Sequence, residues 1–210
     1  VQSGDFGAAL MAKPARVATC VQSMRDACTI PVTVKTRIGI DHLDSYEFLL
    51  DFIATVADAG CDTFIIHARK AWLHGLSPKQ NREIPPLDYG VAKRLKAQFP
   101  SLSIILNGGL DSLEAAQSAL ANFEGTMLGR AVYHNPYLLS GVDKALFNDP
   151  QAAPTRRDAV IAMLPYMDRH LAGGGRLAQV AKHLLGLYLG EPGARRWRRT
   201  LSTEMHAAGS

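Results

Sequence analysis

The pattern that decides the fold is clearest in the run Ile104-Ile105-Leu106-Asn107-Gly108-Gly109, where three apolar residues end in an amide and two glycines. Three other short apolar runs also end in a polar or glycine cluster. They are Val32-Thr33-Val34-Lys35-Thr36-Arg37, Phe64-Ile65-Ile66-His67-Ala68-Arg69 and Thr126-Met127-Leu128-Gly129-Arg130. An amphipathic segment separates each run from the next. This alternation predicts βα units on a parallel sheet.

Spacing and capping signals place the individual elements. Apolar residues recur at helical intervals after Pro14, and Gly60 stands where a helix ending at Ala59 would need its terminal glycine. The predicted strands cover 31–36, 62–67, 102–106 and 125–128. The predicted helices cover 14–27, 41–59, 88–98 and 112–121. Residues 68–87 contain three prolines and are expected to form a long loop after the second strand.

Only four βα units are visible, whereas an eight-stranded barrel usually needs about 250 residues. The sheet is therefore either open and doubly wound, or half of a barrel lies on the amino-terminal side. A first residue that is not Met favours the second alternative. We expect an α/β fold: the last four βα units of a (β/α)8 TIM barrel over residues 1–149, then a small all-helical domain over 150–210. Helices are expected in it near 155–172, 176–189 and 192–207.

The composition is that of an ordinary soluble globular protein, with 47% hydrophobic and 20% charged residues among 210. No apolar run approaches the roughly 18 residues that cross a bilayer, so no membrane partner is expected. The three cysteines, Cys20, Cys28 and Cys61, have no metal-ligand spacing and are expected to be free thiols in a reducing cytoplasm. None ends a predicted strand, so none is a candidate catalytic residue. No metal site is expected.

Positive charge is concentrated near the carboxyl terminus. The net charge of the chain is +4, and residues 155–210 contain nine Arg or Lys against four Asp or Glu. A basic surplus on one segment is typical of a protein that binds an anionic polymer. The alternative is an ordinary solvated helix face.

Candidate ligands stand where the strands end, because ligands of parallel α/β sheets bind at the carboxyl ends of strands. The residues at the four ends are Lys35, His67, Asn107-Gly108-Gly109 and Gly129-Arg130. Glycines let the backbone approach a phosphate, and a guanidinium adds a charge-assisted donor. The set predicts a site for a phosphate-bearing cofactor. Ordinary structural roles remain open for each: a solvated lysine, a satisfied histidine and tight turns.

Two further basic clusters suit a nucleotide or another anionic partner. Lys79 and Arg82 lie on the proline-rich loop after the second strand, and Arg195 and Arg198 are three residues apart on a predicted helix, so they share a face. Trp197 points elsewhere and is expected to be packed rather than stacked on a base. Here too the alternative is ordinary surface charge.

Several long motifs resemble those of the tRNA-dihydrouridine synthases, most closely the A subfamily. The resemblance runs almost end to end. The segments that carry it are VTVKTRIGID, DSYEFL, FIIHARKAWL, GLSPKQNREIPPLDY, NGGL, GR and PGARRWRR. It implies a flavin-binding TIM barrel with a helical domain, in which NADPH reduces FMN and a uridine of the tRNA D-loop, at position 20 or 20a, becomes 5,6-dihydrouridine. It further implies a cytoplasmic enzyme that is monomeric at full length and binds no DNA.

The resemblance also implies roles for particular residues. FMN contacts are expected at Lys35, His67, Asn107, Gly108, Gly109, Gly129 and Arg130. Contacts to tRNA are expected at Lys79, Arg82, Arg195 and Arg198. In the family a hydride goes to uracil C6, and a cysteine in an Asn-x-Gly-Cys-Pro motif protonates C5. That motif would precede Val1, so no catalytic residue is expected in this chain, and the chain alone is expected to be inactive.

Two alternative functions belong to other classes. One is another FMN-dependent TIM-barrel oxidoreductase, similar to dihydroorotate dehydrogenase. The basic helical tail and the loop SPKQNREIPP argue against it, because a small diffusible substrate needs neither. The other is a non-catalytic RNA-binding fragment. The polar residues at the strand ends argue against this alternative for the parent protein.

Overall fold

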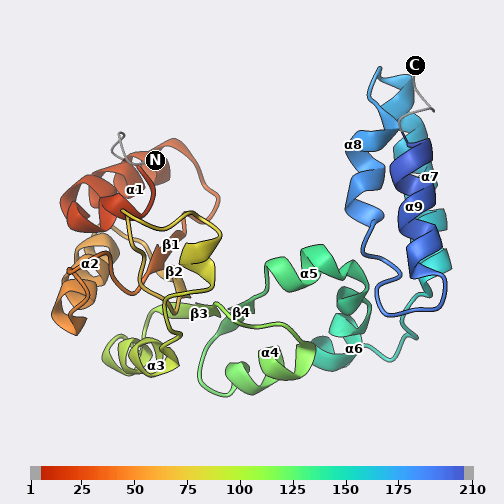
Figure 1. Ribbon diagram of the computed structural model, residues 1–210. Helices are drawn as coiled ribbons and strands as arrows, with labels where there is room; N and C mark the ends of the chain where they lie inside the picture. Colours follow the sequence, from red (N-terminus) through yellow and green to blue (C-terminus); the bar gives the residue numbers. More distant parts are fainter. Residues whose placement is uncertain (1–5, 206–210) are drawn as a thin grey trace. The chain divides into compact units, whose positions relative to one another are not determined.

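The computed structural model describes residues 6–205 (Figure 1). The predicted domain ends at Val1 and Ser210, and the last two residues of the helix expected over 192–207, lie outside this range. The chain divides into two compact units. The first is Val1–Leu110 with Ser118–Met127, and the second is Asp111–Gln117 with Leu128–Ser210.

A four-stranded parallel sheet organises the first unit, in the order β1-β2-β3-β4. The strands are β1 (Val34–Arg37), β2 (Thr63–His67), β3 (Ser103–Asn107) and β4 (Gly125–Met127). Each strand therefore pairs with the strand that follows it in the chain. A doubly wound sheet reverses direction at a switch point, and no reversal occurs among these strands. The parallel sheet and its connecting helices confirm the α/β prediction and are consistent with part of a TIM barrel.

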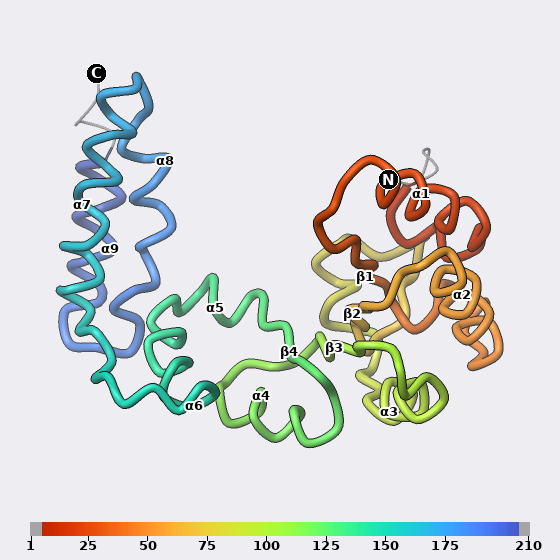
Figure 2. The backbone as a smooth tube through the Cα atoms, turned by 180° about the vertical axis from the view of Figure 1, so that it is seen from behind, coloured from red at the N-terminus to blue at the C-terminus, as the bar shows by residue number. Residues whose placement is uncertain are grey.

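One face of the sheet forms the core of the first unit. The register aligns Phe64 with Ile104 and Ile66 with Leu106, and all four side chains are almost completely buried. Side chains alternate between faces along a strand, so the residues between them point to the other face. Figures 1 and 2 show α1 (Pro14–Ala27), α2 (Tyr46–Asp58) and α3 (Tyr89–Gln98) along one side of β1, β2 and β3.

Local signals in the sequence fix the ends of these helices. The Ser45 hydroxyl accepts a hydrogen bond from the Phe48 amide at 3.1 Å and caps α2, while the Asp88 carboxylate does the same for the Val91 amide of α3. At the other end of α2, Gly60 adopts a φ of 93°. The Arg25 guanidinium donates to the Gly60 carbonyl, which ties α1 to the end of α2.

The second helix begins later than predicted. Residues 41–59 were expected to be helical, but α2 starts at Tyr46. Asp41 has a φ of 45°, and its carboxylate accepts a hydrogen bond from the Leu73 amide at 2.8 Å. Asp44 is paired with Lys70 at 2.7 Å. Both side chains are therefore engaged with a distant loop, and this contact replaces the first helical turn.

Helices make up the described secondary structure of the second unit, to which α4 (Leu113–Leu120) contributes part of its length. They are α5 (Arg130–His134), η3 (Pro136–Gly141), α6 (Val142–Phe147), α7 (Arg156–Ala172), α8 (Leu177–Ala181), η4 (Lys182–Leu184) and α9 (Ala194–Glu204). A capping box of Thr155 and Asp158 starts α7. In both views α7, α8 and α9 lie side by side (Figures 1 and 2).

The helix predicted over 176–189 is wrong in its length. Only Leu177–Ala181 is α-helical, followed by η4 and by turns with i+3 hydrogen bonds, such as Leu187 to Leu184 at 3.0 Å. A Cβ at Gly186 would lie 2.0 Å from the His134 carbonyl oxygen. The backbone at Gly186 is thus pressed against α5, and this packing replaces a continuous helix. Within residues 6–205, no helix combines the length and apolar character needed to cross a membrane.

Candidate functional site

The register of the sheet sets polar residues side by side at the carboxyl ends of the strands. Arg37 aligns with His67, and His67 aligns with Asn107. Lys35 lies two residues before Arg37 and so faces the same side of the sheet. The structure therefore brings Lys35, His67 and Asn107 to one face, as the sequence predicted for these three.

Lys35 and Arg37 place two positive charges on neighbouring positions of this face. Partial desolvation, and next the charge of Arg37, hold the pKa of Lys35 below its usual value. A cavity of about 410 Å³ opens along β1, and Lys35 and Arg37 line it together with Val34, Thr36 and residues of η1 (Gly7–Ala12). Two adjacent cations beside a cavity of this size favour an anionic or electron-rich ligand.

His67 is built into the glycine turn that follows β3. The residue is only 8% exposed. Gly108 has a φ of 108°, and a Cβ there would lie 2.7 Å from Cδ2 of His67. The Tyr89 hydroxyl donates to the Gly108 carbonyl at 2.6 Å. The imidazole therefore packs directly on the glycine backbone, and β2 and β3 present it as part of a fixed surface.

Gly109 and Asn107 complete this turn. Gly109 has a φ of 70°, and a Cβ on it would lie 2.4 Å from Leu87. Internal packing alone therefore requires both glycines, whatever ligand they meet. The Asn107 amide donates to the Met127 carbonyl at 2.7 Å, so it also fastens the end of β4 to β3.

Gly129 and Arg130 follow β4 in the chain and belong to the second unit. Gly129 has a φ of −123° and a ψ of −88°, and no described atom lies within 4 Å of the position of a Cβ. Packing within the unit therefore does not explain this glycine, unlike the other two. Arg130 is exposed at the start of α5. The role of both residues as cofactor ligands remains a prediction.

The loop after β2 is more ordered than its prolines suggest. Lys79 and Arg82 are both exposed at the short 3₁₀ turn η2 (Gln80–Arg82). The Arg37 guanidinium reaches this turn and donates to the Asn81 carbonyl at 2.9 Å. Burial, and then the charges of Arg69 and Arg82, lower the pKa of Arg37 to about 10. We call the loop after β2, which carries Lys79 and Arg82, the basic loop, and Lys35, Arg37, His67 and Asn107 the strand-end cluster. The charges of the basic loop therefore act on the strand-end cluster.

Arg37 is the functional candidate that sequence reasoning missed. The signal was present, because Arg37 follows Lys35 by two residues in a strand and must share its face. Its contact with the loop was not visible, since Asn81 lies far along the chain. Arg69 was missed as well: it donates to the carbonyls of Pro85 and Glu83 and so holds the end of the loop.

The arginines of α9 form a separate surface in the second unit. Arg195 and Arg198 are both exposed on this helix. Trp197 faces away from them: its Nε1 donates to the Leu184 carbonyl at 2.8 Å, and its ring lies 4.8 Å from that of Tyr188. The prediction that Trp197 is packed is confirmed.

Comparison with known proteins shows one consistent match. The family model described as dihydrouridine synthase matches residues 1–209. Proteins named tRNA-dihydrouridine(20/20a) synthase are similar to the whole chain: that of Shewanella oneidensis is 56% identical over 210 residues, that of Vibrio cholerae 54% over 211 and that of Escherichia coli 55% over 213. The chain spans 63%, 64% and 61% of the length of these curated relatives.

Proposed function

We propose a function from one premise: this chain belongs to the dihydrouridine synthase family. The resemblance noted in the sequence is thereby confirmed. We propose that the whole protein reduces a uridine in the D-loop of tRNA, at position 20 or 20a, to 5,6-dihydrouridine, with FMN as cofactor and NADPH as reductant. We further propose a cytoplasmic monomer whose residues 1–149 form the last four βα units of a TIM barrel and whose residues 150–210 form a helical tRNA-binding domain.

The observation that carries the proposal is the cluster of Lys35, Arg37, His67 and Asn107 on one face at the strand ends. These residues fit a flavin mononucleotide. Cationic and imidazole donors suit the electron-rich ring and its carbonyl oxygens, and Gly109 adds exposed backbone beside them. Gly129 and Arg130 would add a phosphate contact. The chemistry supplied by such a flavin is hydride transfer from NADPH to the uracil ring.

The residues of this chain bind and orient rather than donate the proton to uracil C5. Cys61 is buried, and burial raises the pKa of its thiol, while Cys20 belongs to α1 and Cys28 directly follows it. None of the three lies at a carboxyl strand end. We therefore assign no catalytic residue to this chain, and we expect the 210-residue chain alone to form no dihydrouridine.

The proposal is tested on a protein of the relatives' full length that carries this sequence. Purified protein should show a flavin absorbance spectrum and should form dihydrouridine in unmodified tRNA when NADPH is added. Flavin reduction coupled to a small dihydropyrimidine, without activity on tRNA, would instead indicate a dihydroorotate-dehydrogenase-like enzyme. Binding of tRNA without any flavin would indicate a non-catalytic RNA-binding protein.

Arg130→Ala in the same full-length protein should weaken flavin retention. A charge-assisted contact with the phosphate contributes about 1.5–3 kcal/mol, so the variant should lose flavin during gel filtration. Lys144→Ala provides a control, because it removes an exposed positive charge from the second unit at a position with no proposed ligand. Equal flavin occupancy in the two variants would exclude the phosphate role of Arg130.

A further inference from the structure

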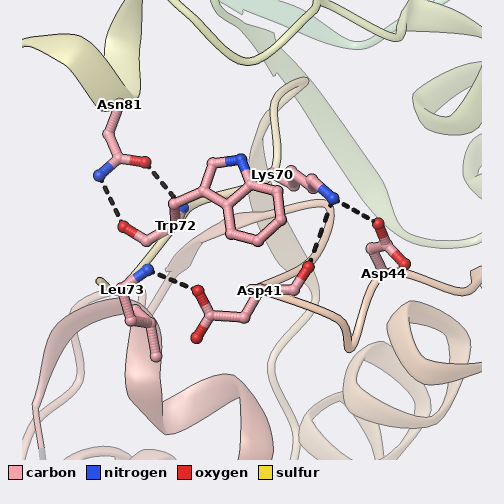
Figure 3. Close-up of polar contacts among 6 residues, drawn as sticks. All are labelled: Asp41, Asp44, Lys70, Trp72, Leu73 and Asn81. Carbon is pink, nitrogen blue, oxygen red and sulfur yellow. Dashed lines mark hydrogen bonds and ion pairs between the residues drawn. The ribbon is translucent and has the colours of Figure 1, made fainter. Parts of the chain in front are cut away.

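The carboxamide of Asn81 fastens the basic loop to itself (Figure 3). Its Oδ1 accepts from the Trp72 amide at 2.7 Å, and its Nδ2 donates to the carbonyls of Trp72 at 2.7 Å and Leu76 at 3.3 Å. The residue is 9% exposed. We call these three hydrogen bonds the Asn81 latch. Because they use an acceptor and both donors in one fixed orientation, no other side chain of this size can make them all.

Contacts beyond the carboxyl ends of β1 and β2 hold Trp72, the partner of Asn81, in place. Lys70 bonds the Asp44 carboxylate at 2.7 Å and the Asp41 carbonyl at 3.3 Å, and its ammonium lies 4.2 Å from the centre of the Trp72 ring (Figure 3). The hydrogen bond from Lys70 lowers the pKa of Asp44, which keeps this carboxylate charged. The Leu73 amide is held by Asp41. The chain is therefore held by hydrogen bonds both before and after Trp72, at Lys70 and at Leu73.

The backbone of Asn81 is fixed as firmly as its side chain. Its carbonyl accepts from Arg37 at 2.9 Å and its amide donates to the Ser77 carbonyl at 2.9 Å. Lys79 and Arg82 lie two residues before and one residue after it, and both are exposed. The two cations thus flank a residue whose backbone and side chain are both held by hydrogen bonds, one of them from Arg37 of the strand-end cluster.

We infer that Asn81 is a positioning residue for RNA, which sets where Lys79 and Arg82 meet the phosphodiester backbone of the substrate. The inference rests on the proposed function. Without the latch the turn would have to be ordered during binding, and ordering rotamer-rich side chains weakens association. The number of cations that meet phosphate would stay the same. Loss of the latch should therefore leave the salt dependence of tRNA binding unchanged, whereas loss of a cation should reduce it.

Steady-state kinetics of the full-length protein separate position from charge. Asn81→Ala should raise KM for tRNA about tenfold, with kcat at saturating tRNA and flavin content close to wild type. The slope of log affinity against log salt should not change. The double variant Lys79→Ala, Arg82→Ala should instead flatten that slope by about one for each phosphate that is no longer neutralised. Adding Asn81→Ala to the double variant should raise KM no further, because Asn81 acts through those two residues.

Asn81→Asp keeps the volume and the Oδ1 acceptor but replaces Nδ2, which supplies both donors, by one oxygen that would face the Trp72 and Leu76 carbonyls. It should therefore raise KM for tRNA as Asn81→Ala does. His74→Ala, an exposed change on the same loop, should leave KM unaltered. Hydrogen exchange at the Trp72 amide, which donates to Asn81, should speed up in both Asn81 variants and not in His74→Ala.

The outcomes have distinct meanings. Wild-type protein that does not bind tRNA would overturn the proposed function and this inference with it. Wild-type protein that binds tRNA, together with Asn81 variants of unchanged KM, would overturn this inference alone. Loss of flavin, or a flattened salt slope in Asn81→Ala, would also overturn it, because either result assigns Asn81 a general structural role.

Discussion

Replacing Gly108 by alanine should destabilise the protein by about 2–5 kcal/mol and release flavin. The φ of 108° disfavours any residue with a Cβ, and the added carbon would lie 2.7 Å from Cδ2 of His67 and 3.1 Å from Cδ2 of Leu87. Conformational strain and overpacking therefore act together, and the His67 imidazole must move to relieve the overpacking. Urea denaturation measures the free energy of unfolding, and the absorbance spectrum measures the flavin that remains bound.

Gly75→Ala is the matched control for this prediction. Gly75 has a similar positive φ, 83°, but no described atom lies within 4 Å of where its Cβ would be. Gly75→Ala should lower the free energy of unfolding by the conformational strain alone, about 1 kcal/mol, and flavin should stay bound. If Gly108→Ala were no more destabilising than Gly75→Ala, the packing of His67 on the glycine turn would be excluded.

The double variant Arg195→Ala, Arg198→Ala should bind tRNA more weakly by on the order of tenfold or more at low salt. Both guanidinium groups are exposed on α9, and the packed Trp197 holds the helix so that they face outward together. If each meets a phosphate, the salt slope should fall by about two. Salt titrations of tRNA binding by the full-length protein measure both quantities, and flavin content should not change.

Arg196→Ala is the control for the α9 prediction. Arg196 lies about 100° around the helix from Arg195 and is also exposed, so Arg196→Ala removes a charge from the same helix on a different face. It should reduce affinity much less than Arg198→Ala alone. A uniform effect of all three arginines would show a general attraction to the polyanion rather than a specific contact face.

Much of the fold is determined by signals that are local in the sequence. The first helix has the predicted bounds, Pro14–Ala27, because proline at its start and apolar spacing along it are local features. Gly60 ends α2 as expected. The carboxyl ends of the strands were predicted to within one residue, since a polar residue after an apolar run marks the rim of a parallel sheet.

Other features depend on contacts between distant parts of the chain. The start of α2 moved from Asp41 to Tyr46 because Leu73 and Lys70 bind the side chains of the intervening loop. Periodicity cannot reveal such partners. The Asn81 latch was invisible for the same reason: a single asparagine between a glutamine and an arginine resembles any solvated loop position until its hydrogen bonds are known.

The pairing of each strand with the next one along the chain has a consequence for how the protein acquires its structure. Every new ladder closes a local connection, the longest being that between β2 and β3, which contains η2 and α3. Because the entropy of loop closure grows only slowly with loop length, the entropy lost at each closure is modest. The sheet can therefore grow one unit at a time as synthesis proceeds from the amino terminus. Its last strand, β4, has only three residues and depends on the Asn107 amide for an additional tie. We expect this strand to join last and to fray first, and its hydrogens to exchange soonest among those of the sheet.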